Sequence, residues 1–145
     1  MNIEELNELW GKDGAIDLTN VSRDAANIPY LHNKYYTMFI REKNKLIKYK
    51  ANYKKLIRLK DDYYRGILDP DELKELGWKP CLVKVRPAEI QKYIESDNDV
   101  INASIEVGRQ EELAKFLESI VGMINYRSQQ LRLIVDMKKF ENGGY

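Results

Sequence analysis

The chain has 145 residues, and one compact domain of this length buries about two thirds of the surface that its unfolded chain exposes. The composition is 43% hydrophobic and 32% charged, with only 8 glycines and 4 prolines, which favours long helices with a hydrated face over sheets and loops. A single cysteine, Cys81, excludes an internal disulfide framework, and charges interrupt every apolar run before it reaches the roughly 20 residues of a membrane span. No apolar core of secretory length opens the chain, so we expect a soluble cytosolic protein.

Two short helices are predicted at the start of the chain. Apolar residues at helical spacing indicate the first of them, namely Ile3, Leu6, Leu9 and Trp10. Gly11 and Gly14 then end it. Asp17 or Thr19 can cap a second helix. Pro29 removes one backbone hydrogen bond, which predicts a kink or a restart at that point.

The longest predicted helix runs from about Tyr30 to Arg65, because no residue breaks the pattern and Gly66 can form its C-terminal cap. Such a helix spans roughly 50 Å, so it needs a packing partner. Its apolar stripe alternates steps of three and four residues, as in a coiled coil, and consists of Phe39, Leu46, Tyr49, Tyr53, Leu56, Tyr63, Tyr64 and Ile67. Most lysines lie outside this stripe, but Lys60 lies within it.

The same helix contains a strongly basic segment. Residues 41–60 hold nine basic residues against the single acid Glu42, which gives this segment a net charge of +8 and leaves −7 for the rest of the chain. This asymmetry is typical of contact with nucleic acid or a membrane surface, and the alternative is a solvated helix face. Cations that follow phosphates and flat rings that stack on bases together bind single-stranded nucleic acid. For Tyr64, stacking on bases and packing within the helix seam both remain open.

Three short elements are predicted next. Asp69 and Pro70 have the pattern of a cap and first residue of a two-turn helix that ends before Gly77. The segment from Trp78 to Arg86 is predicted to be a strand-like linker, and Pro87 opens another short helix.

A C-terminal helix is predicted from about Gln110 to Phe140, with one apolar face and no free helix in the chain to cover it. We therefore expect this face to join subunits through Leu113, Phe116, Leu117, Ile120, Ile124, Leu131 and Ile134. Arg127 projects beside the face, so we expect it either to pair with an acid or to extend its stem to solvent.

These elements predict an all-α protein in which two long helices are joined by short ones. We interpret residues 1–145 as a single helical domain. Residues 1–66 form the N-terminal helix and the long basic arm, residues 67–104 form a connector, and residues 105–145 form the oligomerisation helix.

Residues for catalysis or metal binding are sparse. The only histidine, His32, lies beside tyrosines in a predicted helix, where a surface or packing role is expected. One cysteine and one histidine far apart in sequence cannot supply a zinc site, and no phosphate-binding loop, dinucleotide fingerprint or nucleophile elbow is present. We expect no enzymatic activity, no metal and no cofactor.

Five short strings, in three groups along the sequence, have the pattern of one protein family. They are Ile16-Asp-x-Thr19 followed by Asp24-Ala-Ala-Asn27, then Arg58-x-Lys60 before Asp62-Tyr-Tyr-x-Gly66, and finally Asp136-Met-x-x-Phe140-Glu-x-Gly143. In this order they resemble the UvsY recombination mediators of T-even-type bacteriophages. Pro29 and the linker at 78–87 depart from the family pattern, so the resemblance does not extend to the bend between the arm and the C-terminal half.

The resemblance implies a small helical homo-oligomer, a ring of six or seven subunits (hexamer or heptamer), joined by the C-terminal helix. It further implies a protein of the cytoplasm of the phage-infected bacterial host that binds single-stranded DNA. Such a protein promotes loading of a RecA-like recombinase onto DNA covered by single-strand-binding protein. The alternatives are a coiled-coil scaffold without direct DNA binding and a basic helix lying on an anionic membrane.

The resemblance also implies where DNA binds. A basic-x-basic pair ahead of the Asp-Tyr-Tyr-x-Gly string is a DNA-binding determinant in the family, and it falls on Arg58 and Lys60. Together with the charge pattern, this gives the predicted nucleic-acid-binding residues Arg58, Lys60, Lys50, Lys54, Lys55, Arg65 and Tyr64. Arg58 and Lys60 lie about 200° apart around a helix, so we expect Arg58 on the broad cationic face and Lys60 to reach outward near a subunit junction.

Overall fold

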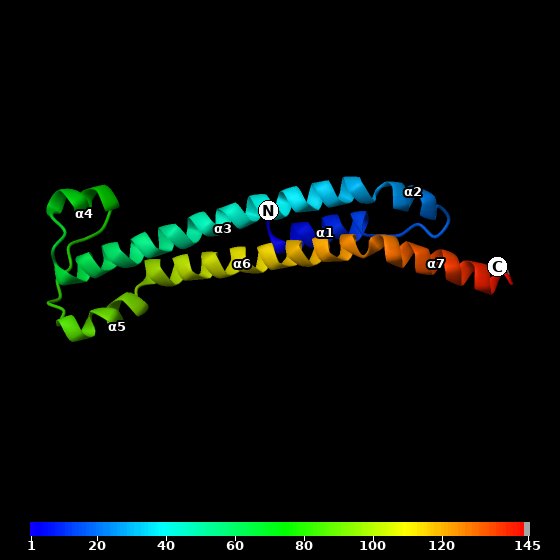
Figure 1. The fold of residues 1–145 in the computed structure, drawn as a ribbon. Coiled ribbons are helices and arrows are strands. Elements are labelled where there is room, and N and C mark those ends of the chain that lie inside the picture. The colour runs from blue at the N-terminus through cyan, green and yellow to red at the C-terminus, as the bar shows by residue number, and fades with distance from the viewer. Residues whose placement is uncertain (144–145) are drawn as a thin grey trace. The chain divides into compact units, whose positions relative to one another are not determined.

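The structure is a computed structural model that describes residues 1–143, and within that range its elements are all helices (Figure 1). The prediction of an all-α fold is therefore confirmed. The chain divides into two compact units, one formed by Met1–Asn44 with Gln110–Tyr145 and the other by Lys45–Arg109. No described helix is both long enough and apolar enough to cross a membrane.

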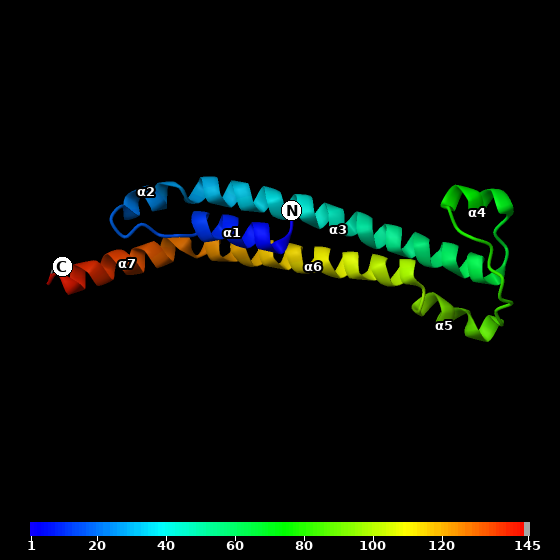
Figure 2. The same ribbon diagram turned by 180° about the vertical axis from the view of Figure 1, so that it is seen from behind.

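The first unit combines both ends of the chain. It holds α1 (Ile3–Asp13), α2 (Val21–Ala26), the first part of α3 (Ile28–Arg65), the last part of α6 (Asn98–Asn125) and α7 (Arg127–Glu141). In both views α1 lies between α3 and α6 (Figures 1 and 2). The core of the unit accordingly draws on all three helices, through Leu6, Leu31, Tyr35, Leu113, Leu117, Ile120 and Ile124.

A polar contact fixes α1 against α3 at the edge of this core. The fully buried Tyr35 donates a hydrogen bond to Asp13 Oδ2 at 2.8 Å, and Lys34 Nζ lies 2.6 Å from the same oxygen. Trp10 packs edge-on against the Tyr35 ring, with 5.2 Å between ring centroids. Burial raises the pKa of the Tyr35 hydroxyl, and the hydrogen bond to Asp13 adds to this rise. Tyr35 is therefore a neutral donor that anchors the last turn of α1.

The second unit surrounds the C-terminal end of α3. It holds α4 (Pro70–Leu76), the 3-10 helix η1 (Pro87–Glu89), α5 (Ile90–Glu95) and the start of α6. Its core is a cluster of Ile90, Ile94 and Val100, against which Tyr53, Leu56, Ile57, Tyr64 and Val85 pack. Gly66 ends α3 as predicted, since its φ of 74° is left-handed and the Ile67 N–H donates to Asp62 O at 3.2 Å.

The predicted helix boundaries hold to within about two or three residues for α1, α3 and α4. The helix does restart near Pro29, but two residues earlier than expected, because α2 ends at Ala26 and α3 begins at Ile28. The predicted cap of α2 was wrong. Asn20 caps that helix by accepting a hydrogen bond from the Arg23 N–H at 3.3 Å.

Two further expectations were wrong. The segment between Trp78 and Arg86 forms no strand, since no backbone ladder is available to pair with it in the described chain. The C-terminal helix begins earlier than predicted, where Asp97 Oδ1 accepts hydrogen bonds from the N–H groups of Asp99 (2.9 Å) and Val100 (3.2 Å). It is also interrupted at Tyr126, which separates α6 from α7 without any proline or glycine at that position.

Candidate nucleic-acid interface

Exposed cations follow α3 through the second unit. The exposed set comprises Lys45, Lys48, Lys50, Lys54, Lys55, Arg58 and Arg65. For Lys54, Lys55 and Arg58, no ion pair exists with any residue in the range 1–143. Lys54 and Arg58 are four residues apart and so lie side by side on the helix surface. This face presents uncompensated positive charge to solvent.

Arg65 continues the row formed by Lys54 and Arg58, but its charge is partly used. Its Nε donates to Asp61 Oδ2 at 2.8 Å, one helical turn earlier. Both side chains are exposed, so the pair is weak and a phosphate can compete for the guanidinium. Arg65 is therefore a less available cation than Arg58.

Lys60 is not among the exposed cations. Its side chain is only 5% exposed, and its Nζ lies 2.9 Å from Asp99 Oδ2 and 3.1 Å from Asp97 Oδ2. The same ammonium sits 3.9 Å from the centroid of the Trp78 ring, within cation–π range. The expectation that Lys60 reaches outward was wrong, because two carboxylates and an indole hold it inside the second unit.

Tyr64 also belongs to this interior network. Its hydroxyl donates to Asp97 Oδ2 at 2.5 Å, and its ring centroid lies 5.1 Å from that of Tyr63 and 5.5 Å from that of Tyr93. Burial and the neighbouring carboxylate raise the pKa of the Tyr64 hydroxyl. Burial alone would raise the pKa of Asp97, but the hydrogen bonds from Tyr64 and Lys60 outweigh it and lower that pKa. These contacts favour packing over base stacking for Tyr64.

The apolar residues expected to join subunits are mostly covered within the chain. The core of the first unit includes Leu113, Leu117, Ile120 and Ile124, with Phe116 packed against it. Leu131 is also buried, and Ile134 is half-buried. The interpretation that this helix lacks a mate in its own chain was wrong, because α1 and α3 cover it.

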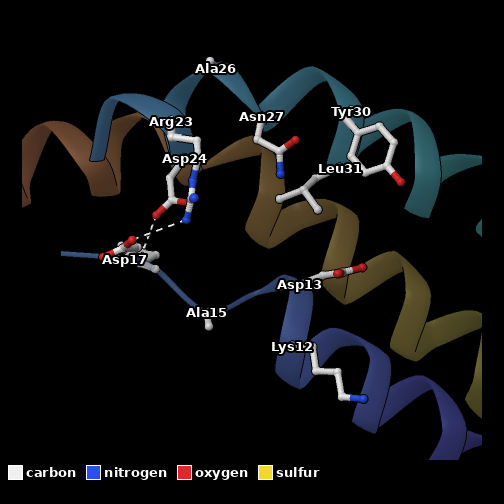
Figure 3. Close-up of a pocket in the computed structure, with 11 residues that line it drawn as sticks. Lys12, Asp13, Ala15, Asp17, Arg23, Asp24, Ala26, Asn27, Tyr30 and Leu31 are labelled. Atoms are coloured by element: carbon white, nitrogen blue, oxygen red, sulfur yellow. Dashed lines mark hydrogen bonds and ion pairs between the residues drawn. The ribbon is translucent and has the colours of Figure 1, made fainter. Parts of the chain in front are cut away.

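The string from Ile16 to Asn27 lines a cavity of about 660 Å³ in the first unit (Figure 3). Its carboxylates are used locally: the Asp17 N–H donates to Asp24 Oδ2 at 2.7 Å, and Thr19 N–H donates to Asp17 Oδ1 at 2.9 Å. The Thr19 hydroxyl also donates to Asp17 Oδ1, and these two hydrogen bonds lower the pKa of Asp17. Its lining holds three carboxylates, of Asp13, Asp17 and Asp24, and only two cations, Lys12 and Arg23, so it lacks the excess of positive charge that a polyanion needs.

Comparison with known proteins connects this geometry to one family. A sequence model of the family described as "Recombination, repair and ssDNA binding protein UvsY" matches residues 9–144. The recombination protein uvsY of Enterobacteria phage T4 is 27% identical over 143 residues, which cover 99% of each chain. Two crystal structures of the bacteriophage T4 recombination mediator protein UvsY are similar at 26% identity. One has a TM-score of 0.80 over 98% of both chains, and the other 0.81 over 97% of this chain and 99% of that one.

Proposed function

The chain belongs to the UvsY family of recombination, repair and single-stranded-DNA-binding proteins, and from this premise we propose that it is a recombination mediator. It binds single-stranded DNA and promotes loading of a RecA-like recombinase onto DNA covered by single-strand-binding protein. The similar T4 protein, UvsY, whose structure is known in two crystal forms, is itself a recombination mediator. The proposal is tested by recombinase ATP hydrolysis on covered single strands: the protein should shorten the lag, and an unchanged lag contradicts mediation.

The exposed face of α3 that carries Lys54 and Arg58 is the observation that supports DNA binding most directly. Contacts between such cations and phosphates carry no sequence information, which suits a protein that must act on any strand. The rings of Tyr63 and Tyr64 already pack against each other and against Trp78 and Tyr93, so the strand is held mainly by charge. Binding of this kind weakens with salt and allows the strand to pass to the recombinase.

Changing both Lys54 and Arg58 to alanine should weaken binding to a labelled oligo-dT and leave helicity intact, because both side chains are exposed and alanine favours helix. If each residue neutralises one phosphate, the slope of log affinity against log salt flattens by about 0.7 per residue per engaged subunit. Fluorescence anisotropy at several salt concentrations measures both quantities.

The matched control changes Lys74 and Lys92 to alanine, which removes the same charge from α4 and α5 of the same unit. It should affect binding much less. If the Lys54/Arg58 variant keeps the wild-type affinity and salt slope, DNA does not bind on this face, and a scaffold without direct DNA binding becomes the better explanation.

Assembly into a closed ring of six or seven subunits follows from the same proposal. A ring repeats the cationic face of α3 several times, so weak contacts add up to a high avidity. We place the contact between subunits on α7, where Leu133, Met137 and Phe140 are 59%, 54% and 85% exposed. Their spacing of four and three residues puts them on one helix face, which leaves an apolar stripe for a neighbouring subunit.

Replacing Met137 with aspartate should break the assembly into smaller species without loss of helix, because it places a charge in the centre of this stripe. Native mass spectrometry gives the subunit number. Ser128→Asp is the control, since it adds the same charge to an exposed position about 180° away around α7. If Met137→Asp assembles like the wild type, the contact lies on another surface.

A further inference from the structure

We infer that Lys60 is a positioning residue of the DNA-binding helix and does not itself contact DNA. This inference rests on the proposed function, because it concerns how α3 presents its exposed cations. It also departs from what the basic-x-basic string implies, since only Arg58 of that pair then faces the strand.

Lys60 is buried and has close partners, which keep it from a phosphate. Both carboxylates lie within 3.1 Å of Lys60 Nζ, and the Trp78 ring covers the ammonium at 3.9 Å. A phosphate can reach Lys60 only after it displaces this ring and two carboxylates. If a phosphate took Lys60 from its carboxylates, it would leave their buried negative charge uncompensated, which disfavours phosphate binding at this lysine.

The partners of Lys60 show what it holds in place. Asp97 caps the start of α6 and also accepts the Tyr64 hydroxyl, so Lys60 fastens the last two turns of α3 to the beginning of α6. Trp78 follows α4 and packs edge-on against Tyr63, with 5.4 Å between ring centroids. Lys60 is thus the shared contact of three segments of the second unit.

The same contacts fix which side of α3 faces solvent. Measured in the same direction around the helix, Arg58 lies about 160° and Lys54 about 120° from Lys60. While Lys60 points into the unit, Arg58 and Lys54 must point out of it. Loss of the Lys60 contact therefore weakens DNA binding by loosening the end of α3, without removing a phosphate contact.

Lys60→Met separates the two roles. If Lys60 positions α3, the variant should bind oligo-dT with a lower affinity and the wild-type salt slope. Its melting temperature should fall by roughly 10 °C. Lys60→Arg should restore the affinity, because a guanidinium can bond both carboxylates. A slope that flattens by about 0.7 per engaged subunit would mean direct contact with phosphate, and an unchanged affinity would mean no role in binding. Either result overturns the inference.

Asp99→Asn is a milder test, because the affinity for DNA should change in opposite directions if Lys60 contacts DNA and if it positions α3. If Lys60 contacted DNA, neutralising this neighbour would free the lysine and raise the affinity. If Lys60 positions α3, the change removes one of its two anchors and lowers the affinity instead. Asp71→Asn, an exposed change on α4 with the same charge, measures the general electrostatic gain. A rise for Asp99→Asn above that of Asp71→Asn contradicts the inference.

The proposed function and this inference fail in different ways. If the wild-type protein does not bind oligo-dT, the proposed function is wrong at the outset. If it binds through Lys54 and Arg58 but Lys60→Met flattens the salt slope, only the role of Lys60 is wrong.

Discussion

Replacing Ile124 with alanine should lower the free energy of unfolding by about 2–5 kcal/mol, which is among the largest effects expected of a single truncation in this chain. Ile124 is 1% exposed in the core of the first unit, so its loss leaves a cavity among residues from α1, α3 and α6. Urea unfolding followed by circular dichroism measures the change.

Met123→Ala is the matched control, since the neighbouring side chain is 52% exposed. It should change the free energy of unfolding by no more than about 0.5 kcal/mol. Equal effects at the two positions would contradict the assignment of Ile124 to a core within one chain. The contrast also separates folding from assembly, because a change at Ile124 should unfold the unit and not release folded monomers.

Replacing Arg127 with methionine should destabilise the first unit by about 2–3 kcal/mol, because hydrogen bonds from a charged donor are lost at a buried site. Arg127 is 4% exposed, and its guanidinium donates to Gly14 O at 2.7 Å and Ala15 O at 3.2 Å. Both interpretations from the sequence were wrong: within residues 1–143 Arg127 pairs with no acid, and it does not extend to solvent. Its partners are backbone carbonyls just after α1.

The Nε of Arg127 has no hydrogen-bond partner among the described atoms, so methionine also removes one stranded donor and part of the loss is offset. Arg132→Met serves as the control, since Arg132 is exposed on the same helix. Thermal unfolding of the two variants gives the comparison. If both melt at the wild-type temperature, the contacts with Gly14 and Ala15 contribute nothing to stability.

Local signals predicted the helices well, and long-range contacts account for most errors. The extent of α3 followed from the lack of helix breakers and from Gly66, both readable within a few residues. The partners of Arg127 lie 112 and 113 residues away, and no local pattern identifies a backbone carbonyl as a partner. The same limit hid the mate of the C-terminal helix, since the short α1 gave little sign that it lies against α6.

For the candidate site, the sequence identified the exposed cations but did not show that Lys60 is buried. One signal was available: Lys60 falls within the apolar stripe of α3, and a cation in such a stripe needs a buried acid. The sequence does not show which acid pairs with Lys60. Asp97 and Asp99 lie at the start of another helix, α6, and the chain holds many other carboxylates. Trp78 was likewise missed as a partner, since a linker gives no helical periodicity.

The way the first unit joins the two ends of the chain has a consequence for biosynthesis. Residues 45–109 form their unit from one continuous stretch, so it can fold while the ribosome is still translating. The other unit also needs Ile124, which shares a core with Leu6, and Arg127, which is translated 113 residues after its partner Gly14. Until then the sides of α1 and early α3 that pack against α6 stay uncovered on the nascent chain. Contacts between residues so far apart in sequence form slowly, so the newly made protein is most prone to aggregate during this period.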